Sequence, residues 1–464
     1  MSSRQQRAEI RLTRVRAMLG ALGEPQRHYP VVHVTGTSGK GSTAAAVAAI
    51  LMAAGYRAGL RTSPYLQVPT EKLQIGASLI DAGSFAETVT LVLDTAVRLF
   101  PPDQADPPIS YAEVWSVLGY VWFAERNVDL AVVEVGAGGR FDATNVIDPI
   151  VSVITSVGLD HLVTLGPTIA DIAWHKAGII KPGATAVIGD LPPEAHTIVV
   201  EEARSASVEV VRACDPDPSR PRVSPLARGF QGRNAEVATA VAMTLRQRGF
   251  EITEAAIGAG LGSARLPGRL ELMPRTLDPP VWIDGAHNED KVAALTAEVV
   301  RRFTVGPLPV IVLGMLSSKD PAPLLAKLGS VASSIVLTEP FVIGRESLTV
   351  DALEGAVTAA GYAGAIHIEP DPNAAVRFAE DIARRESAPV LVTGSMYLVG
   401  QVRRRWYPDL DVVLQRTPWP AALSENWLGP PRAFSGLVRD KADDERDQPA
   451  DHQIPTGAEE LIIR

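Results

Sequence analysis

The fold is decided by the stretch VVHVTGTSGKGST at residues 31–43. The apolar run Val31–Val34 predicts a strand, and the small residues after it lead into a helix expected over about Ser42–Ala54. Three glycines in the loop let backbone N–H groups turn inward, the helix N-terminus adds a partial positive charge, and Lys40 adds a full one. The stretch therefore predicts a phosphate-binding loop with Lys40 near the terminal phosphates.

The spacing in this loop differs from that of the common P-loop. Gly36 and Gly39 are only three positions apart, and the hydroxyl residues Ser42 and Thr43 come one place later than usual after the lysine. An ordinary glycine-rich turn between a strand and a helix is the alternative. The order of strand, glycines, lysine and hydroxyls favours phosphate binding over that alternative.

A second stretch, LAVVEVGAGGRFDATN at 130–145, is an apolar strand that ends in an acidic residue. Glu134 stands where a strand next to a phosphate loop can present a carboxylate to Mg²⁺. A lone carboxylate at a strand end is otherwise simply solvated. The glycines that follow allow a ligand to approach closely, which favours the metal-binding interpretation.

Short apolar runs alternate with amphipathic stretches along most of the chain, which predicts parallel α/β architecture. The alternation restarts after Pro267-Gly268. We therefore predict an N-terminal P-loop-type parallel-sheet ATPase domain over 1–266 and a smaller, Rossmann-like C-terminal α/β domain over 267–418. Residues 419–464 are rich in acidic residues, proline and glycine, and predict a disordered tail.

Composition excludes several classes of protein. The net charge of −9 over 464 residues argues against binding to nucleic acid or to anionic membranes. Cys214 is the only cysteine, so neither an intrachain disulfide nor a cysteine-cluster metal site can form. The apolar stretch 44–60 predicts a buried helix rather than a membrane span. The arginine-rich N-terminus predicts an ordinary first helix rather than a targeting signal. We expect a cytoplasmic monomer that acts on small molecules.

Together, TGTSGKGS (35–42) and VEVGAGGRFDATN (133–145) resemble motifs of the folylpolyglutamate synthase/dihydrofolate synthase family, within the Mur ligase superfamily. The resemblance extends over about residues 11–407 in a fixed order of motifs. The further motifs are TSPYLQVPTEKLQIGA (62–77), SYAE (110–113), SVGLDHLVTLG (156–166), HKAGIIKPG (175–183), RLPGRLE (265–271), WIDGAHN (282–288), GMLSSKD (314–320) and TGSMYLVG (393–400). Two departures, Tyr65 and Lys72, lie in the segment that resembles the folate-contacting loop.

The resemblance implies a role for each matching residue. It implies that ATP is bound by the loop residues and by residues of the second domain: Thr37, Gly39, Lys40, Gly41, Ser42, Thr43, Asn234, Arg269 and Asp284. It implies Mg²⁺ ligands at Ser63, Glu134 and His161, leaves room for a monovalent cation such as K⁺, and implies a carbamylated lysine at 176. Catalytic roles are implied for Lys40, Lys176, Arg269 and His287.

The implied activity is ATP-dependent amide formation between L-glutamate and a folate or dihydropteroate carboxylate. A Mur-type ligase acting on a UDP-linked cell-wall precursor is the alternative, but only about thirty residues precede Val31, too few for an additional uridine-binding domain. A non-catalytic relative should have lost Lys40, Glu134 or Asp284, and all three are present. Dihydrofolate synthesis, polyglutamate extension and a bifunctional enzyme all remain open.

Overall fold

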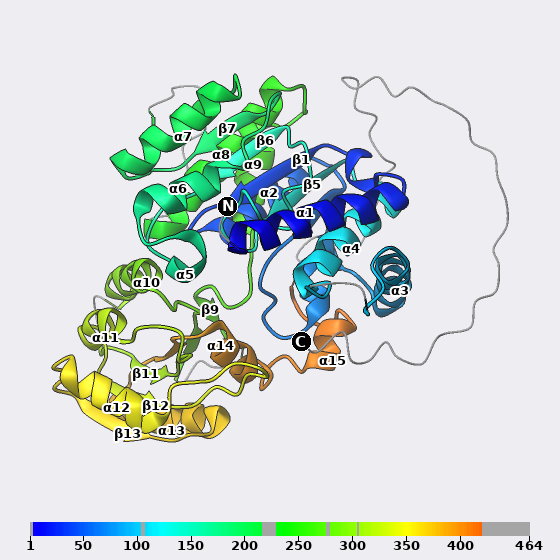
Figure 1. Cartoon of the computed structure of the whole chain (residues 1–464). Helices are drawn as coiled ribbons and strands as arrows, with labels where there is room; N and C mark the ends of the chain where they lie inside the picture. The colour runs from blue at the N-terminus through cyan, green and yellow to red at the C-terminus, as the bar shows by residue number, and fades with distance from the viewer. Residues whose placement is uncertain (1–2, 104–106, 216–228, 275–278, 304–305, 420–464) are drawn as a thin grey trace.

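The computed structural model describes residues 3–103, 107–215, 229–274, 279–303 and 306–419 (Figure 1). Two sheets, each flanked by helices, make up this part of the chain. We call the unit on the eight-stranded sheet the first domain and the unit on the six-stranded sheet the second domain. The predicted tail begins at 419, and its residues 420–464 lie outside the described part.

The sheet of the first domain has the strand order β4-β3-β2-β5-β1-β6-β7-β8. Its strands are β1 (Val31–Thr35), β2 (Ala58–Arg61), β3 (Leu73–Ile75), β4 (Ser78–Leu79), β5 (Leu130–Glu134), β6 (Val151–Ile154), β7 (Thr185–Ile188) and β8 (Glu209–Arg212). Pairing is parallel from β2 to β8, while β3 and β4 add an antiparallel edge. The predicted parallel sheet is therefore confirmed, with a short hairpin attached to one side.

Alternation along β1 explains how both faces of this sheet are covered. Val32 and Val34 belong to one apolar cluster and Val31 to another, because successive side chains of a strand point to opposite faces. The helices of this domain are α1 (Ser3–Ala21), α2 (Lys40–Ala53), α3 (Ala82–Leu99), α4 (Tyr111–Glu125), α5 (Leu162–Leu165), α6 (Ile169–Ala177), α7 (Pro193–Ser205), α8 (Gly229–Gln247) and α9 (Glu254–Ser263). Helices α2, α8 and α9 pack on one face and α1, α3 and α4 on the other.

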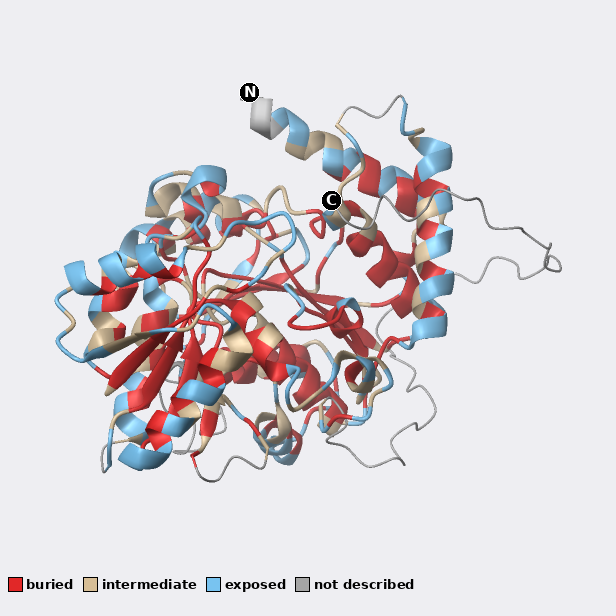
Figure 2. Ribbon diagram, turned by 90° about the horizontal axis from the view of Figure 1, so that it is seen from below, coloured by how far each residue is buried: buried red, intermediate tan, exposed pale blue. Residues whose placement is uncertain are grey.

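The second domain has the strand order β13-β12-β11-β14-β10-β9, parallel except for β9. Its strands are β9 (Glu271–Leu272), β10 (Val281–Ile283), β11 (Val310–Leu313), β12 (Ser334–Leu337), β13 (Ala365–Ile368) and β14 (Val390–Thr393). Its helices are α10 (Glu289–Arg302), α11 (Ala322–Gly329), α12 (Val350–Ala359), α13 (Pro372–Glu386) and α14 (Met396–Arg403). Helices α13 and α14 cover one face and α10, α11 and α12 the other, and Figure 2 shows buried residues concentrated in the sheets.

After α14 the chain returns from the second domain to the first. Helix α15 (Asp409–Val413) places Val412 in a small apolar cluster with Val68 and Leu79. The Gln415 side chain donates to the Leu79 carbonyl and accepts from the Leu79 N–H, each at 3.0 Å. The segment 409–419 is therefore a strap that joins the two domains.

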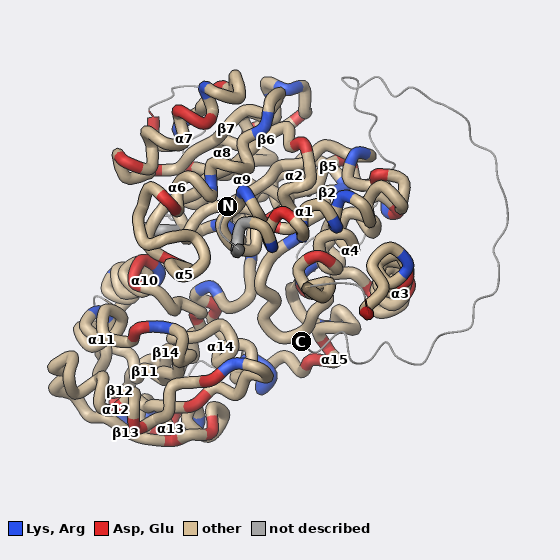
Figure 3. Tube along the Cα trace, viewed as in Figure 1, with Lys and Arg blue, Asp and Glu red and all other residues tan. Residues whose placement is uncertain are grey.

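Two surface properties bear on the expectations from composition. In the described part of the chain, no helix is both long enough and apolar enough to cross a membrane. Figure 3 shows Lys and Arg interspersed with Asp and Glu over both domains in this view.

Deleting residues 420–464 should leave turnover within about tenfold of the full-length value, equivalent to about 1.4 kcal/mol. The physical reason is that this composition cannot form a core, whereas the strap before it is packed on the first domain. A deletion from 409 onward is the comparison, since it also removes α15 and should lower the unfolding temperature. A larger loss of turnover in the shorter deletion would show that the tail contributes to the site.

Candidate active site

The carboxyl ends of the central strands bring the predicted residues to one edge of the first sheet. In the parallel register, Val34 of β1 is level with Glu134 of β5, and Thr35 is level with Ile154 of β6. Ligands of open α/β sheets bind outside this edge. A cavity of about 850 Å³ lies there, and its opposite wall is formed by the second domain.

The phosphate loop occupies one wall of this cavity. Gly39 has φ +83°, and a Cβ at this position would lie 2.2 Å from Asn234 Oδ1, so glycine is required. Helix α2 begins directly after it, and Lys40 Nζ folds back to donate to the Gly36 carbonyl at 2.9 Å. Burial lowers the pKa of Lys40, while Glu134 acts to raise it. The loop therefore presents a helix N-terminus and an ammonium group to the cavity.

The end of β6 holds this loop in shape. The Ser156 carbonyl accepts from Thr37 N–H, and Ser156 Oγ accepts from Ser38 N–H, both at 2.9 Å. The Thr37 hydroxyl is paired with Gly158, donating to its carbonyl at 3.0 Å and facing its N–H at the same distance. The side chain and the backbone N–H of Thr37 are thus both used to order the loop.

Glu134 ends β5 inside the same cavity and is almost completely buried. Its Oε2 accepts from Ser63 N–H at 2.9 Å, and a Cβ at Gly41 would come within 3.2 Å of the same oxygen. Burial raises the pKa of Glu134, and the nearby Lys40 counteracts this rise. The carboxylate is therefore held close to the phosphate loop by the backbone of the segment that contains Ser63.

The donor set tests whether Mg²⁺ fits here. Within the ranges that the structure describes, no group of three or more His, Cys, Asp or Glu side chains could hold a metal ion unaided. Mg²⁺ typically uses one or two carboxylates and completes its octahedron with water and substrate phosphates. Glu134 with the Ser63 hydroxyl fits that pattern, provided that the ion arrives with a nucleotide. His161 lines the same cavity, although its side chain is half exposed.

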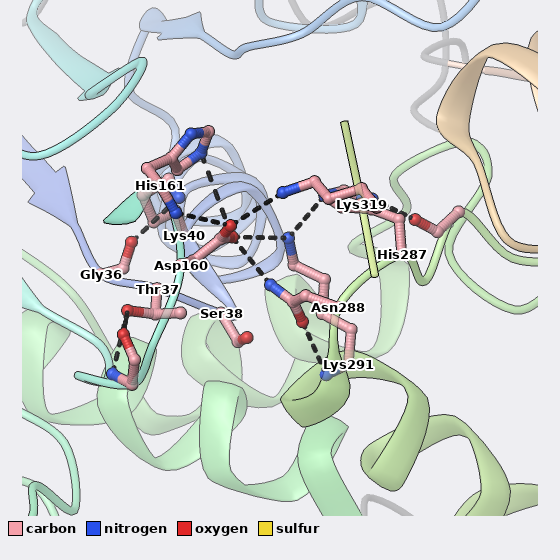
Figure 4. Close-up of polar contacts among 12 residues, drawn as sticks. Gly36, Thr37, Ser38, Lys40, Asp160, His161, His287, Asn288, Lys291 and Lys319 are labelled. Atoms are coloured by element: carbon pink, nitrogen blue, oxygen red, sulfur yellow. Dashed lines mark hydrogen bonds and ion pairs between the residues drawn. The ribbon is translucent and has the colours of Figure 1, made fainter. Parts of the chain in front are cut away.

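Asp160 joins the two domains across the cavity (Figure 4). Its Oδ1 accepts from Lys319 Nζ at 2.9 Å, its Oδ2 accepts from Asn288 Nδ2 at 2.8 Å, and Lys291 Nζ lies 3.9 Å from Oδ2. Burial would raise the pKa of Asp160, but His161 and the lysines outweigh it and lower the pKa. One carboxylate of the first domain is therefore ionised and surrounded by donors of the second.

His287 is held neutral within this group. Its Nδ1 lies 2.8 Å from the Gly285 carbonyl, which can only accept, so Nδ1 carries the hydrogen and Nε2 accepts from Lys291 Nζ at 3.1 Å. Burial, followed by Lys291, lowers the pKa of His287 well below its ordinary value. Burial, followed by Lys40 and Arg269, lowers the pKa of Lys291 to about 7.

The remaining predicted residues lie at the linker and on α8. Asp284 accepts from Leu270 N–H and Ala286 N–H, both at 2.8 Å, and so orders the turn that follows Arg269. Burial raises the pKa of Asp284, and Arg269 acts to lower it. The Asn234 side chain faces the cavity from α8, and its buried Nδ2 makes no hydrogen bond within the described part of the chain. This donor suits a polar ligand atom.

The structure brings most of the predicted site residues to one cavity. Those that line it are Thr37, Gly39, Lys40, Gly41, Ser42, Ser63, Glu134, His161, Asn234, Arg269, Asp284 and His287. Thr43 and Lys176 are not among the lining residues, because both side chains are buried behind the wall. Sequence reasoning assigned no role to Asp160, Asn288 or Lys319, although each lies within or next to a quoted motif, and Lys291 carried no signal at all.

The chain matches two family models, the Mur ligase middle domain over residues 34–213 and the Mur ligase glutamate ligase domain over 268–396. These matches define the class: the chain combines the middle domain and the glutamate ligase domain found in Mur ligases. The folylpolyglutamate synthase of Lacticaseibacillus casei is 34% identical over 414 residues, covering 84% of this chain and 93% of that protein. The dihydrofolate synthase/folylpolyglutamate synthase of Bacillus subtilis is 31% identical and covers 85% of this chain and 94% of that protein.

Solved structures agree with these relatives. The Mycobacterium tuberculosis folylpolyglutamate synthase complexed with ADP and AMPPCP has a TM-score of 0.78 and 32% identity, covering 86% of this chain and 96% of that one. Escherichia coli FolC in complex with DHPP and ADP has a TM-score of 0.70 and 28% identity, covering 87% and 93%. The chain belongs to the folylpolyglutamate synthase/dihydrofolate synthase family and is an ATP-dependent ligase. The relatives support this family over a cell-wall ligase.

Proposed function

We propose that this enzyme joins the amine of L-glutamate to a carboxylate of a folate-type acceptor, at the expense of ATP. The observation that carries the proposal is the single cavity with a phosphate loop on one wall and a group of cations on the other. The names of the relatives supply the substrate class. The enzyme would act as a cytoplasmic monomer on small molecules only.

The chemistry follows from the poor reactivity of a carboxylate towards amines. Transfer of the γ-phosphoryl group of ATP to the acceptor carboxylate would form an acyl phosphate and release ADP. The glutamate nitrogen would then attack the acyl carbon, lose its proton, and expel inorganic phosphate. Lys40 and Arg269 line the cavity from opposite domains and would neutralise charge on the moving phosphoryl group.

The second domain offers a receiving site for the carboxylates of glutamate. Lys319 and Lys291 both face the cavity, and both are held there by Asp160. His287 would orient Lys291 for this role, because its unprotonated Nε2 accepts a hydrogen bond from Lys291 Nζ. On this arrangement glutamate would bind to the second domain, and the first domain would hold the activated carboxylate of the acceptor.

When bound with ATP, Mg²⁺ would neutralise phosphate charge during transfer. Glu134 and Ser63 would hold it, and His161 would be the third protein ligand implied by the family resemblance. Ser63 is oriented for this role because its backbone N–H is bonded to Glu134. The remaining ligands would be phosphate oxygens and water.

Stripping bicarbonate from the buffer should lower turnover by roughly tenfold or more, and adding it back should restore turnover. Lys176 is buried, and burial followed by Lys40 lowers its pKa well below the ordinary value, which favours the free amine over the ammonium. That amine can attack CO₂ and release a proton, which yields a carbamate anion next to the cations of the site. Steady-state turnover in CO₂-free and bicarbonate-containing buffers measures the effect.

Lys176→Ala should be inactive and partly rescued by formate, a small carboxylate. Lys181→Ala is the matched control, because Lys181 Nζ bonds the backbone carbonyls of Asn145 and Ile147 and does not line the cavity. The turnover of Lys181→Ala should respond to bicarbonate in the same way as that of the enzyme without a substitution. An active enzyme whose intact mass shows no carbamate would contradict this proposal.

An acceptor panel tests the proposed function itself. The enzyme is incubated with ATP, Mg²⁺ and labelled glutamate, together with dihydropteroate, tetrahydrofolate or a UDP-muramoyl acceptor. We expect label in one or both pteridine acceptors and none in the UDP-linked compound. Label in the UDP-linked compound alone would replace the proposal with the cell-wall alternative.

A further inference from the structure

The segment after β2 belongs to the first domain at one end and to the second domain at the other. Ser63 N–H donates to Glu134 Oε2 of the first domain at 2.9 Å. Three residues later, Leu66 is part of the buried apolar cluster of the second domain, with Val281 and Val310. The carbonyl of Leu66 lies against α14 so closely that a Cβ at Gly400 would be 2.1 Å from it. The segment thus spans the junction between the domains.

A fully buried arginine fixes this segment to the second domain. Arg403, 1% exposed, donates from Nη1 to Gln67 Oε1 at 2.6 Å and from Nη2 to Glu271 Oε1 at 2.9 Å. Gln67 Nε2 donates in turn to the Tyr407 carbonyl at 2.8 Å. Both hydrogen-bonding groups of the Gln67 amide are therefore used across the junction. A buried guanidinium is tolerated only with such complete pairing.

The same arginine reaches the turn that contributes Arg269 to the cavity. Glu271, its ion-pair partner, accepts through Oε2 from Gly268 N–H at 2.8 Å. Gly268 has φ +70° and directly precedes Arg269, so this hydrogen bond fixes the turn. One guanidinium group consequently lies between two segments that both line the cavity, the first through Ser63 and Pro64 and the second through Arg269.

We propose that Gln67 and Arg403 are positioning residues for the ligation reaction, holding the Ser63 segment and the Arg269 turn at a fixed spacing. Neither side chain lines the cavity, so they act through the residues that they hold. The inference rests on the proposed function for its kinetic consequence. Its structural consequence, that the second domain holds residues 62–72 in place, does not depend on the reaction.

A purely stabilising role for Gln67 is the competing explanation, and the chain supplies a control for it. Gln415 makes two side-chain hydrogen bonds across the junction, both to the backbone of Leu79 at the sheet edge. Gln67 makes three, since its Nε2 also lies 3.1 Å from Asp409 Oδ1. Leu79 does not line the cavity, whereas Ser63 does. Gln67→Ala and Gln415→Ala therefore each remove one amide link between the domains, and only the first link leads to the site.

The experiment compares these two variants of the full-length enzyme by kinetics, AMPPCP affinity, thermal unfolding and hydrogen–deuterium exchange. Misplacing a reacting group by about 1 Å can cost roughly a hundredfold in rate, so we expect Gln67→Ala to lower kcat by at least about tenfold. We expect its AMPPCP affinity in the absence of Mg²⁺ to stay within about twofold, since no loop–nucleotide contact is removed. Exchange should become faster in 62–72 and 267–271 in this variant only.

The proposal is overturned by either of two results. The first is an unchanged rate of hydrogen–deuterium exchange in residues 62–72 of Gln67→Ala. This result would overturn the proposal even if the enzyme proved inactive with every folate acceptor. The other is a kcat loss that is equal in both variants and follows their unfolding temperatures. If Gln67→Ala does not fold, Gln67→Asn, whose shorter side chain cannot span to both Arg403 and Tyr407, is used in the same comparison.

Discussion

Lys40→Ala should abolish ligation, lowering turnover by at least about a hundredfold to a thousandfold, while the unfolding temperature stays within a few degrees. Lys40 Nζ is the ammonium that the phosphate loop presents to the cavity, and it donates a hydrogen bond to the Gly36 carbonyl. Removing it deletes charge needed at the terminal phosphates but little packing. Glutamate-dependent ADP release, measured beside thermal unfolding, tests this expectation.

Lys327→Ala is a suitable control for this variant. Lys327 pairs with Glu289 at 3.3 Å on the surface of the second domain and does not line the cavity. It should retain nearly full turnover. Near-normal turnover in Lys40→Ala would contradict the proposal that this loop binds the phosphates of ATP.

Arg269→Ala should slow the chemical step by about a hundredfold while weakening ATP binding only a few-fold. Burial raises the pKa of Asp284 and of Glu134, and the nearby charge of Arg269 partly offsets the rise at both carboxyl groups. We propose that it acts mainly when the γ-phosphoryl group moves, so its loss should appear in the transition state. Single-turnover kinetics with ATP and acceptor separates this step from nucleotide binding.

Arg265→Ala is the matched control, four residues earlier on the same linker. The Arg265 side chain donates to the nearby carbonyls of Gly262 and Ala264, and it does not line the cavity. It should leave the single-turnover rate unchanged. An unchanged chemical rate in Arg269→Ala would mean that the two domains do not share the reaction as proposed.

The parts of the fold that sequence predicts best are those with a local signal. The strand Val31–Val34, the glycine loop and the acidic end of β5 each combine apolar residues with an abrupt polar ending, and the structure contains all three. Strand β2 was missed because Ala58–Arg61 continues an alanine-rich stretch that reads as one helix. Strands β3, β4 and β9 have only two or three residues and no measurable periodicity.

In the candidate site, too, the sequence predicts what has a local signal and misses contacts between distant residues. Helix α2 begins at Lys40 rather than Ser42, and Thr43 N–H bonds the Gly39 carbonyl, which turns the Thr43 side chain into the core. Asp160 and Lys319 meet although 159 positions separate them, and no pattern along the chain encodes that approach. The family resemblance identified the motifs that contain these residues, but only the packing of the two domains shows that they form one group.

The most direct measurement of the proposed reaction follows oxygen from the acceptor to phosphate. The acceptor carboxylate is labelled with ¹⁸O, the full-length enzyme is supplied with ATP, Mg²⁺ and glutamate, and the inorganic phosphate is examined by mass spectrometry. An acyl phosphate requires one acceptor oxygen to leave with each phosphate, so we predict one ¹⁸O in each phosphate released with product. Amide product accompanied by unlabelled phosphate would contradict activation of the acceptor carboxylate by ATP.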